Sequence, residues 1–143
     1  MKYEQIGKNL PALFGALLVS ILFIQSGFDK VFDWNGNLQF LTEHFSKTFM
    51  GSMVPMLLGT MTVMETATGL LSLVGIIYFL LKGSTDVIFY ASILGTASIV
   101  ALFFGQRIAK DYAGSAALIP YFILLLILMY LTNPFVGETK KTD

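Results

Sequence analysis

Residues 54–81 read VPMLLGTMTVMETATGLLSLVGIIYFLL, an almost wholly apolar stretch that carries one charged residue, Glu65. A helix needs about 20 apolar residues to cross the hydrocarbon core of a bilayer, because every backbone N–H and C=O must be paired within the helix there. Pro55 stands in the first turn of this stretch, where a missing N–H is tolerated. Residues 54–81 are therefore predicted to form a transmembrane helix.

Three further stretches have the same character, at about residues 10–31, 86–105 and 112–131. The composition of the whole chain agrees with them, since 55% of the residues are hydrophobic, 13% are charged and the mean hydropathy is +0.74. A soluble domain carries about 25% charged residues. The sequence predicts an all-α integral membrane protein, a bundle of four transmembrane helices that forms a single domain over residues 1–143.

The orientation of the bundle is predicted from its basic residues. An even number of spans places both termini on one side of the membrane, here called side A. Cytoplasmic loops carry an excess of Lys and Arg. Side A has slightly more basic residues than the opposite side B, so both termini are predicted to be cytoplasmic. The residues of side A are Lys2, Lys8, Lys82, Lys140 and Lys141, and those of side B are Lys30, Lys47, Arg107 and Lys110.

The longest connection, at about residues 32–53 on side B, is predicted to contain an amphipathic helix. Its large apolar residues recur at spacings of three and four, which places them on one helix face. They are Trp34, Leu38, Leu41, Phe45 and Phe49. Such a helix lies in the membrane interface or folds over the mouth of the bundle. A surface helix packed for stability and a functional lid both fit this pattern.

Glu65 is the strongest candidate for a functional residue. It lies ten residues beyond Pro55, or about 15 Å along the helix at 1.5 Å per residue, which is near the bilayer centre. An ionisable group there costs roughly 3 kcal/mol on insertion scales and is a functional hypothesis by default. Thr62, Thr66 and Thr68 surround it with hydroxyl groups that are expected to form hydrogen bonds.

The other polar residues of the spans gather toward side B and predict a small cavity that opens to that side. Its walls are expected to hold Gln25, Asp29, Lys30, Glu65, Gln106, Arg107 and Asp111. Arg107 and Asp111 are four residues apart and can pair where the helix continues. At the floor of the cavity, Glu65 is expected either to be protonated through desolvation or to pair with Arg107. The alternative is that these side chains fix the helix register through interhelical hydrogen bonds.

Small residues recur every four positions in two places. These ladders are Ala12, Ala16 and Ser20 in the first span, and Ala97, Ala101 and Gly105 in the third. Small residues at this spacing allow helix backbones to approach closely. Both ladders are expected to form contacts inside the bundle rather than faces for dimerisation.

The composition also excludes several kinds of site. Without cysteine the chain has no disulfide, no thiolate metal site and no iron–sulfur ligand. Its single histidine, His44, cannot supply paired imidazoles and is expected to be an exposed loop residue. The net charge is zero, which gives no indication of nucleic-acid binding. The expected partner is the lipid bilayer, and no cofactor is expected to be held covalently or through metal ligands.

At these residues the chain resembles the DoxX family of small four-helix membrane proteins. The matching segments are FIQSGFDK at residues 23–30, Glu65 with Gly69 and Gly75, and QRIAKDYAG at residues 106–114. The resemblance covers about residues 10–132 and implies a bacterial inner-membrane protein. The family includes a subunit associated with quinone-linked sulfur oxidation and relatives linked to membrane-bound oxidoreductase complexes. Relatives with thiol chemistry use cysteines, so that role does not carry over.

Three functions from different classes fit these observations. The first is a quinone-interacting or redox-accessory subunit, in which the polar pocket holds a quinone or a lipid and Glu65 is the proton-exchanging group. The second is a non-enzymatic assembly factor or small structural subunit of a larger membrane complex. The third is a transporter coupled through Glu65, although four spans lack the inverted halves common in transporters. The residues leave open whether the chain is an enzyme.

Overall fold

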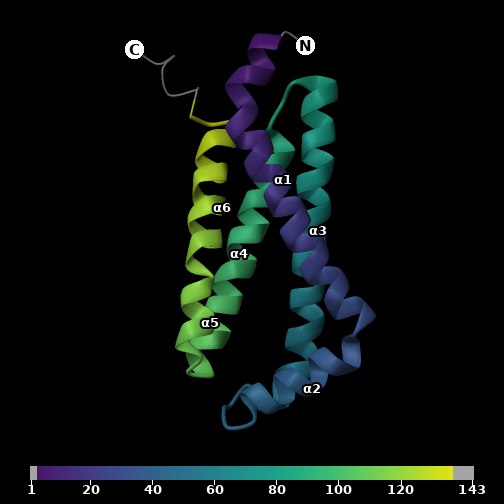
Figure 1. The fold of residues 1–143 in the computed structure, drawn as a ribbon, viewed down its shortest axis with the longest axis vertical. Coiled ribbons are helices and arrows are strands. Elements are labelled where there is room, and N and C mark those ends of the chain that lie inside the picture. Colours follow the sequence, from purple (N-terminus) through teal and green to yellow (C-terminus); the bar gives the residue numbers. More distant parts are fainter. Residues whose placement is uncertain (1–2, 137–143) are drawn as a thin grey trace.

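The computed structural model describes residues 3–136, and every element in this range is a helix. In chain order they are α1 (Tyr3–Phe32), α2 (Trp34–Phe45), the short 3-10 helix η1 (Gly51–Met53), α3 (Val54–Lys82), α4 (Asp86–Ile108), α5 (Tyr112–Ala117) and α6 (Ile119–Thr132) (Figure 1). Four segments of this range are long and apolar enough to cross a membrane: α1, η1 with α3, α4, and α5 with α6. The predicted all-helical fold with four span-length apolar helices is thus confirmed.

The long helices run alternately up and down, so that α1 begins and α6 ends at the same end of the molecule (Figure 1). We refer to that end of the molecule as side A and to the opposite end, where α2 and α5 lie, as side B. Neighbours in space follow the chain: α1 packs on α3, α3 on α4 and α4 on α6, and α6 returns to α1. The side chain of Gln5 donates a hydrogen bond of 2.8 Å to the Gly83 carbonyl. This bond ties the start of α1 to the turn between α3 and α4.

The first and fourth spans differ most from the predicted ones, and α4 ends at Ile108, three residues beyond the predicted end. The first helix begins at Tyr3 rather than near Leu10 and continues through Pro11. A prediction from hydropathy misses the first turns of this helix because they are polar. Glu4 and Lys8, which are one turn apart in this part of the helix, form an ion pair of 2.9 Å. The fourth span is divided at Leu118, between α5 and α6. Proline has no N–H to donate, and Pro120 in the first turn of α6 therefore favours a new helix start at this point.

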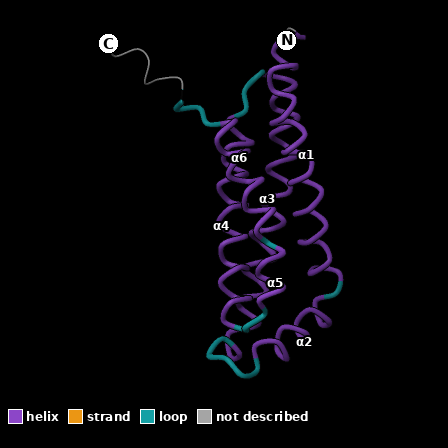
Figure 2. The backbone as a smooth tube through the Cα atoms, turned by 60° about the vertical axis from the view of Figure 1, so that its left-hand side comes forward, coloured by secondary structure: helices purple, strands orange, loops and turns teal. Residues whose placement is uncertain are grey.

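The amphipathic helix predicted between the first two spans is present as α2. Figure 2 shows that it lies across the side B end of the bundle. The side chain of Asp33 caps its start by accepting a hydrogen bond from the Gly36 N–H. Its buried Phe45 packs with Met50 and Val54 and with the half-buried Leu38 and Leu41. The predicted apolar face therefore holds for these side chains.

Phe49 is an exception to the predicted face, because α2 ends at Phe45 and Phe49 is exposed in the following turn. The hydroxyl groups of Ser46 and Thr48 donate hydrogen bonds to the carbonyls of Glu43 and Phe45. Such side-chain bonds compete with the helical backbone pattern. Helical spacing was therefore extended one turn too far in the prediction.

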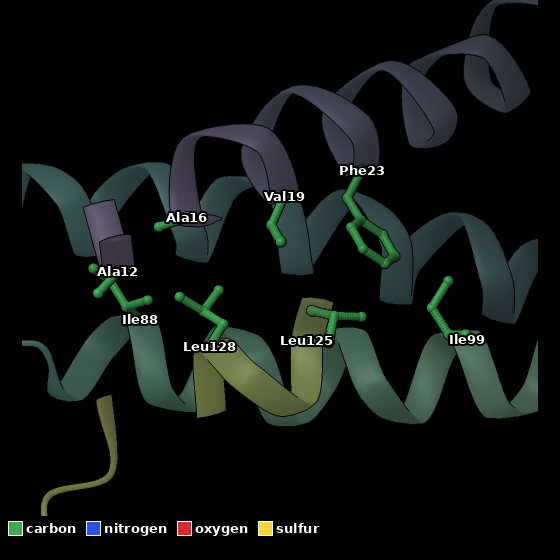
Figure 3. Close-up of a cluster of buried hydrophobic side chains, with 8 residues drawn as sticks. All are labelled: Ala12, Ala16, Val19, Phe23, Ile88, Ile99, Leu125 and Leu128. Atoms are coloured by element: carbon green, nitrogen blue, oxygen red, sulfur yellow. The ribbon is translucent and has the colours of Figure 1, made fainter. Parts of the chain in front are cut away.

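Apolar packing between α1, α4 and α6 forms the main core of the molecule. Figure 3 shows this cluster, which consists of Ala12, Ala16, Val19, Phe23, Ile88, Ile99, Leu125 and Leu128. Each of these side chains is at most 4% exposed. Because the cluster holds no polar side chain, the ionisable residues of the bundle lie outside it.

The contact between α1 and α3 is made by small and hydroxyl-bearing residues. Ser20 donates a hydrogen bond to the Gly69 carbonyl at 3.2 Å, and Ser72 donates one to the Ala16 carbonyl at 2.8 Å. A Cβ atom on Gly69 would lie 2.5 Å from the backbone N of Ile24. The two backbones therefore approach so closely that only glycine fits, and the first small-residue ladder forms an internal contact as predicted.

The second ladder does not lie wholly inside the bundle. Gly105 is buried, and a Cβ atom there would lie 3.4 Å from the Phe45 ring, but Ala97 and Ala101 are exposed. The inward face of α4 is formed instead by residues such as Gly95 and Ser98. The expectation of an internal contact was wrong for the two alanines, because spacing alone does not show which side of a helix faces the bundle.

Replacing Gly69 by alanine is expected to destabilise the fold. The added methyl group meets backbone atoms of α1, which cannot move without shifting the helix, and overpacking of this kind costs about 1–3 kcal/mol. The matched control is Gly59→Ala on the same helix, where the nearest atom to the added Cβ is the edge of the Trp34 ring at 3.8 Å. Thermal unfolding in mild detergent tests this, and equal melting temperatures for the two variants contradict the close approach.

Candidate functional site

Glu65 lies in the interface between α3 and α1 and is 1% exposed. Its Oε2 atom is 2.7 Å from the Lys30 ammonium group and accepts a hydrogen bond of 3.0 Å from the Ser26 hydroxyl. Lys30 also donates to the carbonyl and the hydroxyl oxygen of Ser26. Ser26 and Lys30 are one turn apart on α1, so they face Glu65 together. The buried carboxyl group is thus held by an ammonium group and a hydroxyl from the neighbouring helix.

Lys30 takes the role that the sequence reasoning gave to Arg107. Two ion pairs form among residues 3–136, and Arg107 is in neither. The guanidinium group of Arg107 is exposed and stacks 4.5 Å above the ring of Tyr112. The prediction that Arg107 is the counter-charge of Glu65 was therefore wrong. Lys30 was expected in the same pocket, but not as the partner of Glu65.

The threonines around Glu65 do not bond to it. Thr62 and Thr68 donate their hydroxyl hydrogens to the carbonyls of Leu58 and Met64, one turn earlier in the same helix. Thr66 is half-buried, and its hydroxyl oxygen is buried without a hydrogen-bond partner. Helical threonines commonly bond back to their own helix, and this local bond leaves Ser26 of α1 as the hydroxyl group that reaches Glu65.

Gln25 and Asp29 are exposed and lie outside this group. They are also one turn apart on α1, but each precedes by one residue a side chain that faces Glu65. One residue corresponds to about 100° of rotation on a helix. Gln25 and Asp29 therefore point in a different direction from Ser26 and Lys30. Ser26 and Lys30 lie on the side of α1 that faces α3.

Asp111 also has a local role. Helix α4 ends at Ile108 and Lys110 adopts a positive φ of 58°, so the helical geometry does not continue from Arg107 to Asp111. Instead Asp111 caps α5, accepting a hydrogen bond of 2.8 Å from the Gly114 N–H. The possible i, i+4 pair between Arg107 and Asp111 is lost because the chain turns between them.

A cavity of about 360 Å³ lies between α2, α3 and the side B end of α4. Ligand-binding cavities commonly have volumes of about 300–1,000 Å³. The lining is mainly apolar, and beside several leucines it has aromatic and thioether side chains, among them Phe40, Phe45, Phe49, Met50, Met53 and Met61. Its polar lining comes from three helices: Lys30 of α1, His44 of α2 and Gln106 of α4. Of the side chains predicted to wall a pocket, Lys30 and Gln106 therefore line this cavity.

His44 is a functional candidate that sequence reasoning did not identify. It is half-buried rather than exposed, and its Nε2 atom is 2.8 Å from the amide oxygen of Gln106. Its ring stacks on Phe40 and meets Phe45 edge-on. His44 directly precedes Phe45, which belongs to the apolar stripe of α2, so the imidazole lies at the edge of the buried face of this helix. This position next to Phe45 was the feature of the sequence that could have identified His44 as a candidate.

The cavity can hold a neutral ligand better than an anion. The charge of Lys30 is balanced by Glu65 at 2.7 Å, and Glu65 repels a second carboxylate or phosphate nearby. The Gln106 amide oxygen accepts from the His44 Nε2–H, so the Gln106 NH2 group is the donor that this pair leaves for a ligand. Within residues 3–136, no group of three acidic or histidine side chains is placed to hold a metal ion. The arrangement is suited to binding a planar apolar molecule that carries hydrogen-bond acceptors.

Comparisons with protein-family models, with curated proteins and with solved structures give no significant match. The resemblance to the DoxX family therefore stays a prediction from short motifs. A function for this chain has to be argued from the geometry of the ion pair and the cavity.

Replacing one charged residue of the buried ion pair is expected to destabilise the protein more than replacing both. Lys30→Met leaves Glu65 buried without its counter-charge, and losing one partner of such a pair costs about 3 kcal/mol. Adding Glu65→Gln removes the stranded charge, so the double variant is expected to recover at least half of this loss. Unfolding free energies in mild detergent measure the coupling. Arg107→Met is the control, since its exposed charge contributes less than about 1 kcal/mol.

Equal losses for Lys30→Met and Arg107→Met, or additive losses in the double variant, are incompatible with this ion pair.

Proposed function

We propose that the protein binds a quinone in the cavity roofed by α2 and serves as a redox-accessory subunit of a membrane complex. The observation that carries the proposal is the cavity itself, which combines an aromatic and thioether lining with polar side chains from three helices. A quinone ring is planar and apolar on both faces, and its two carbonyl oxygens accept hydrogen bonds. Lining and ligand are therefore complementary in both respects.

The hydrogen-bond donors have defined roles in this proposal. The Nε2–H of His44 donates to the Gln106 amide oxygen at 2.8 Å and so orients the Gln106 NH2 group, which is the donor for one carbonyl oxygen. Lys30 offers a second, since its side chain is part of the cavity lining and its bond to the Ser26 carbonyl, at 3.1 Å, is longer than its contact with Glu65. A ligand carbonyl takes over that weaker bond, while Glu65 keeps the ammonium group charged and in place.

The proposed placement in the membrane follows from the same elements. The four span-length helices cross a bacterial inner membrane as a four-helix bundle, and α2 lies in the interface at side B with its apolar face toward the cavity. Both termini are then cytoplasmic. The basic residues behind this orientation include Lys2, Lys140 and Lys141, which lie outside the described residues.

The redox role is an accessory one because of the composition. The chain has no cysteine and one histidine, so it lacks the thiolate ligands of iron–sulfur clusters and the pair of imidazoles that holds a bis-histidine haem. Reduction of a quinone to a quinol takes two electrons and two protons. In this proposal the electrons come from a cofactor of a partner subunit and the protons from water, while this chain holds the ring.

A non-enzymatic assembly factor or structural subunit is the alternative, and the exposed surface of the fourth span favours it. In the segment Tyr112–Thr132, 17% of the most apolar 18-residue stretch is buried, and this is the lowest share among the four span-length segments. This surface is available to another subunit. A stoichiometric partner that co-purifies in mild detergent, and persists with Glu65→Gln, supports this alternative if no quinone is bound.

The quinone proposal predicts that cavity variants lose ligand and that variants outside the cavity do not. Protein purified in native lipids is expected to retain quinone, which extraction and mass spectrometry measure. His44→Phe keeps an aromatic ring but removes both nitrogens, and Gln106→Leu removes the amide. Each is expected to weaken quinone binding about tenfold, the effect of losing about 1.4 kcal/mol of hydrogen bonding.

Asp29→Asn is the matched control, because Asp29 is exposed and does not line the cavity. The proposal fails if the unaltered protein neither retains quinone nor binds a water-soluble analogue saturably in nanodiscs.

A further inference from the structure

We infer that the outer face of α4 holds the isoprenoid tail of the quinone whose ring occupies the cavity beneath α2. This inference rests on the proposed function and assigns a second part of the same site. Its basis is the continuity of two hollows. The cavity and an open groove of about 640 Å³ along α4 share two lining residues, Ala101 and Phe104. A chain attached to the ring can pass from one hollow into the other there.

The groove runs in the direction that a lipid-like tail requires. It follows α4 from Phe104 to Ile93, with Met129 of α6 also in its lining. At 1.5 Å per residue this path is about 16 Å long. Phe104 is near the side B end of α4, and Ile93 is toward the middle of the helix. A tail in the groove therefore runs from the interface toward the bilayer centre, as the tail of a membrane amphiphile does.

The shape of the groove comes from small residues between large ones. Ala97 and Ala101 are one turn apart on the same face of α4, and both are exposed. The larger exposed side chains of Ile93, Val100 and Phe104 stand around them. The spaces above the two alanines are matched to the methyl branches of an isoprenoid chain. The exposed position of the alanines, which the spacing of the ladder did not predict, has a role in this arrangement.

The groove offers hydrocarbon contacts and no free polar group. Thr96 is the polar residue in its lining, and its hydroxyl group donates a hydrogen bond of 2.7 Å to the Ser92 carbonyl. A tethered tail also has an advantage over free lipid chains. Binding of the ring places the tail beside the opening at Ala101, which raises its effective concentration there. The tail of the bound ligand is thus favoured over bulk acyl chains.

A single label in the groove tests the position of the tail. The chain has no cysteine, so Ala97→Cys provides one attachment site for a fluorophore. A quinone analogue with a brominated tail is expected to quench this label, with a saturation curve that follows ring binding. The control is the same label at Val63→Cys, an exposed position on α3 that does not line the groove, where quenching is expected to stay at the level of bulk lipid.

A bulky side chain in the groove gives a second test. Ala97→Trp is expected to raise the Kd of a long-tailed analogue about tenfold and to leave the Kd of a short-tailed analogue unchanged, with both expressed as mole fractions in the nanodisc lipid. Val63→Trp is the control for a tryptophan facing lipid. Because Ala97 lines the groove and not the cavity, the ring site stays intact in this variant.

The outcomes separate this inference from the proposed function. If both analogues bind but Ala97→Trp affects them equally or not at all, or position 97 is not quenched, the tail lies elsewhere. If a brominated phospholipid quenches position 97 and the ring analogue does not displace it, bulk acyl chains or a partner helix cover the groove, and the inference is overturned. If neither analogue binds the unaltered protein, the proposed function fails as well.

Discussion

A buried carboxyl group constrains this bundle more than any other single feature. Moving a charged group out of water costs several kcal/mol, and the cost is offset only when a counter-charge and hydrogen bonds are well placed. Glu65 meets this condition through Lys30 and Ser26, both on α1. The ammonium and hydroxyl groups reach it because the two backbones nearly touch: a Cβ atom on Gly27 would lie 2.9 Å from the backbone N of Thr66. The ion pair and the close approach of the backbones are therefore satisfied by one and the same register of α1 on α3.

The cavity follows from this attachment of α1 to α3. Helix α1 crosses the bundle obliquely, starting near α6 at side A and ending on the far side of α3 at side B (Figure 1). The space between α3 and α4 at side B is therefore not filled by α1. The chain turns back after Phe32, and α2 covers this space, with His44 and Phe45 touching α4 at Gln106 and Gly105. The roof, the cavity and its polar residues are consequences of one helix crossing.

Sequence patterns predicted the parts of this structure that depend on local hydropathy. The four span-length helices and the buried side of α2 are examples, since both follow from apolar spacing. The ends of helices were less predictable, because the polar turns before Leu10 and the break before Pro120 depend on single residues. The partner of Glu65 was not predictable from spacing. Gln25 with Asp29, and Ser26 with Lys30, have the same i, i+4 relation, and the choice between them depends on which stripe of α1 meets α3. Gly27, next to Ser26, was the feature of the sequence that could have shown which side of α1 approaches α3.

The need for stability does not by itself explain the ion pair. Well-packed apolar residues of similar volume often replace a buried ion pair with no loss, or with a gain, of stability. Helix register does not require it either, because Ser20 and Ser72 already join α1 to α3 through hydrogen bonds to opposing backbone carbonyls, and Gly69 permits their close approach. The pair has one further property, which is that Lys30 is 17% exposed and lines the cavity while Glu65 is sealed behind it. A basic side chain thereby lies in the wall of an apolar chamber with its charge balanced from within. This arrangement fits recognition of a neutral acceptor, and it gives the costly burial of Glu65 a purpose that packing alone does not.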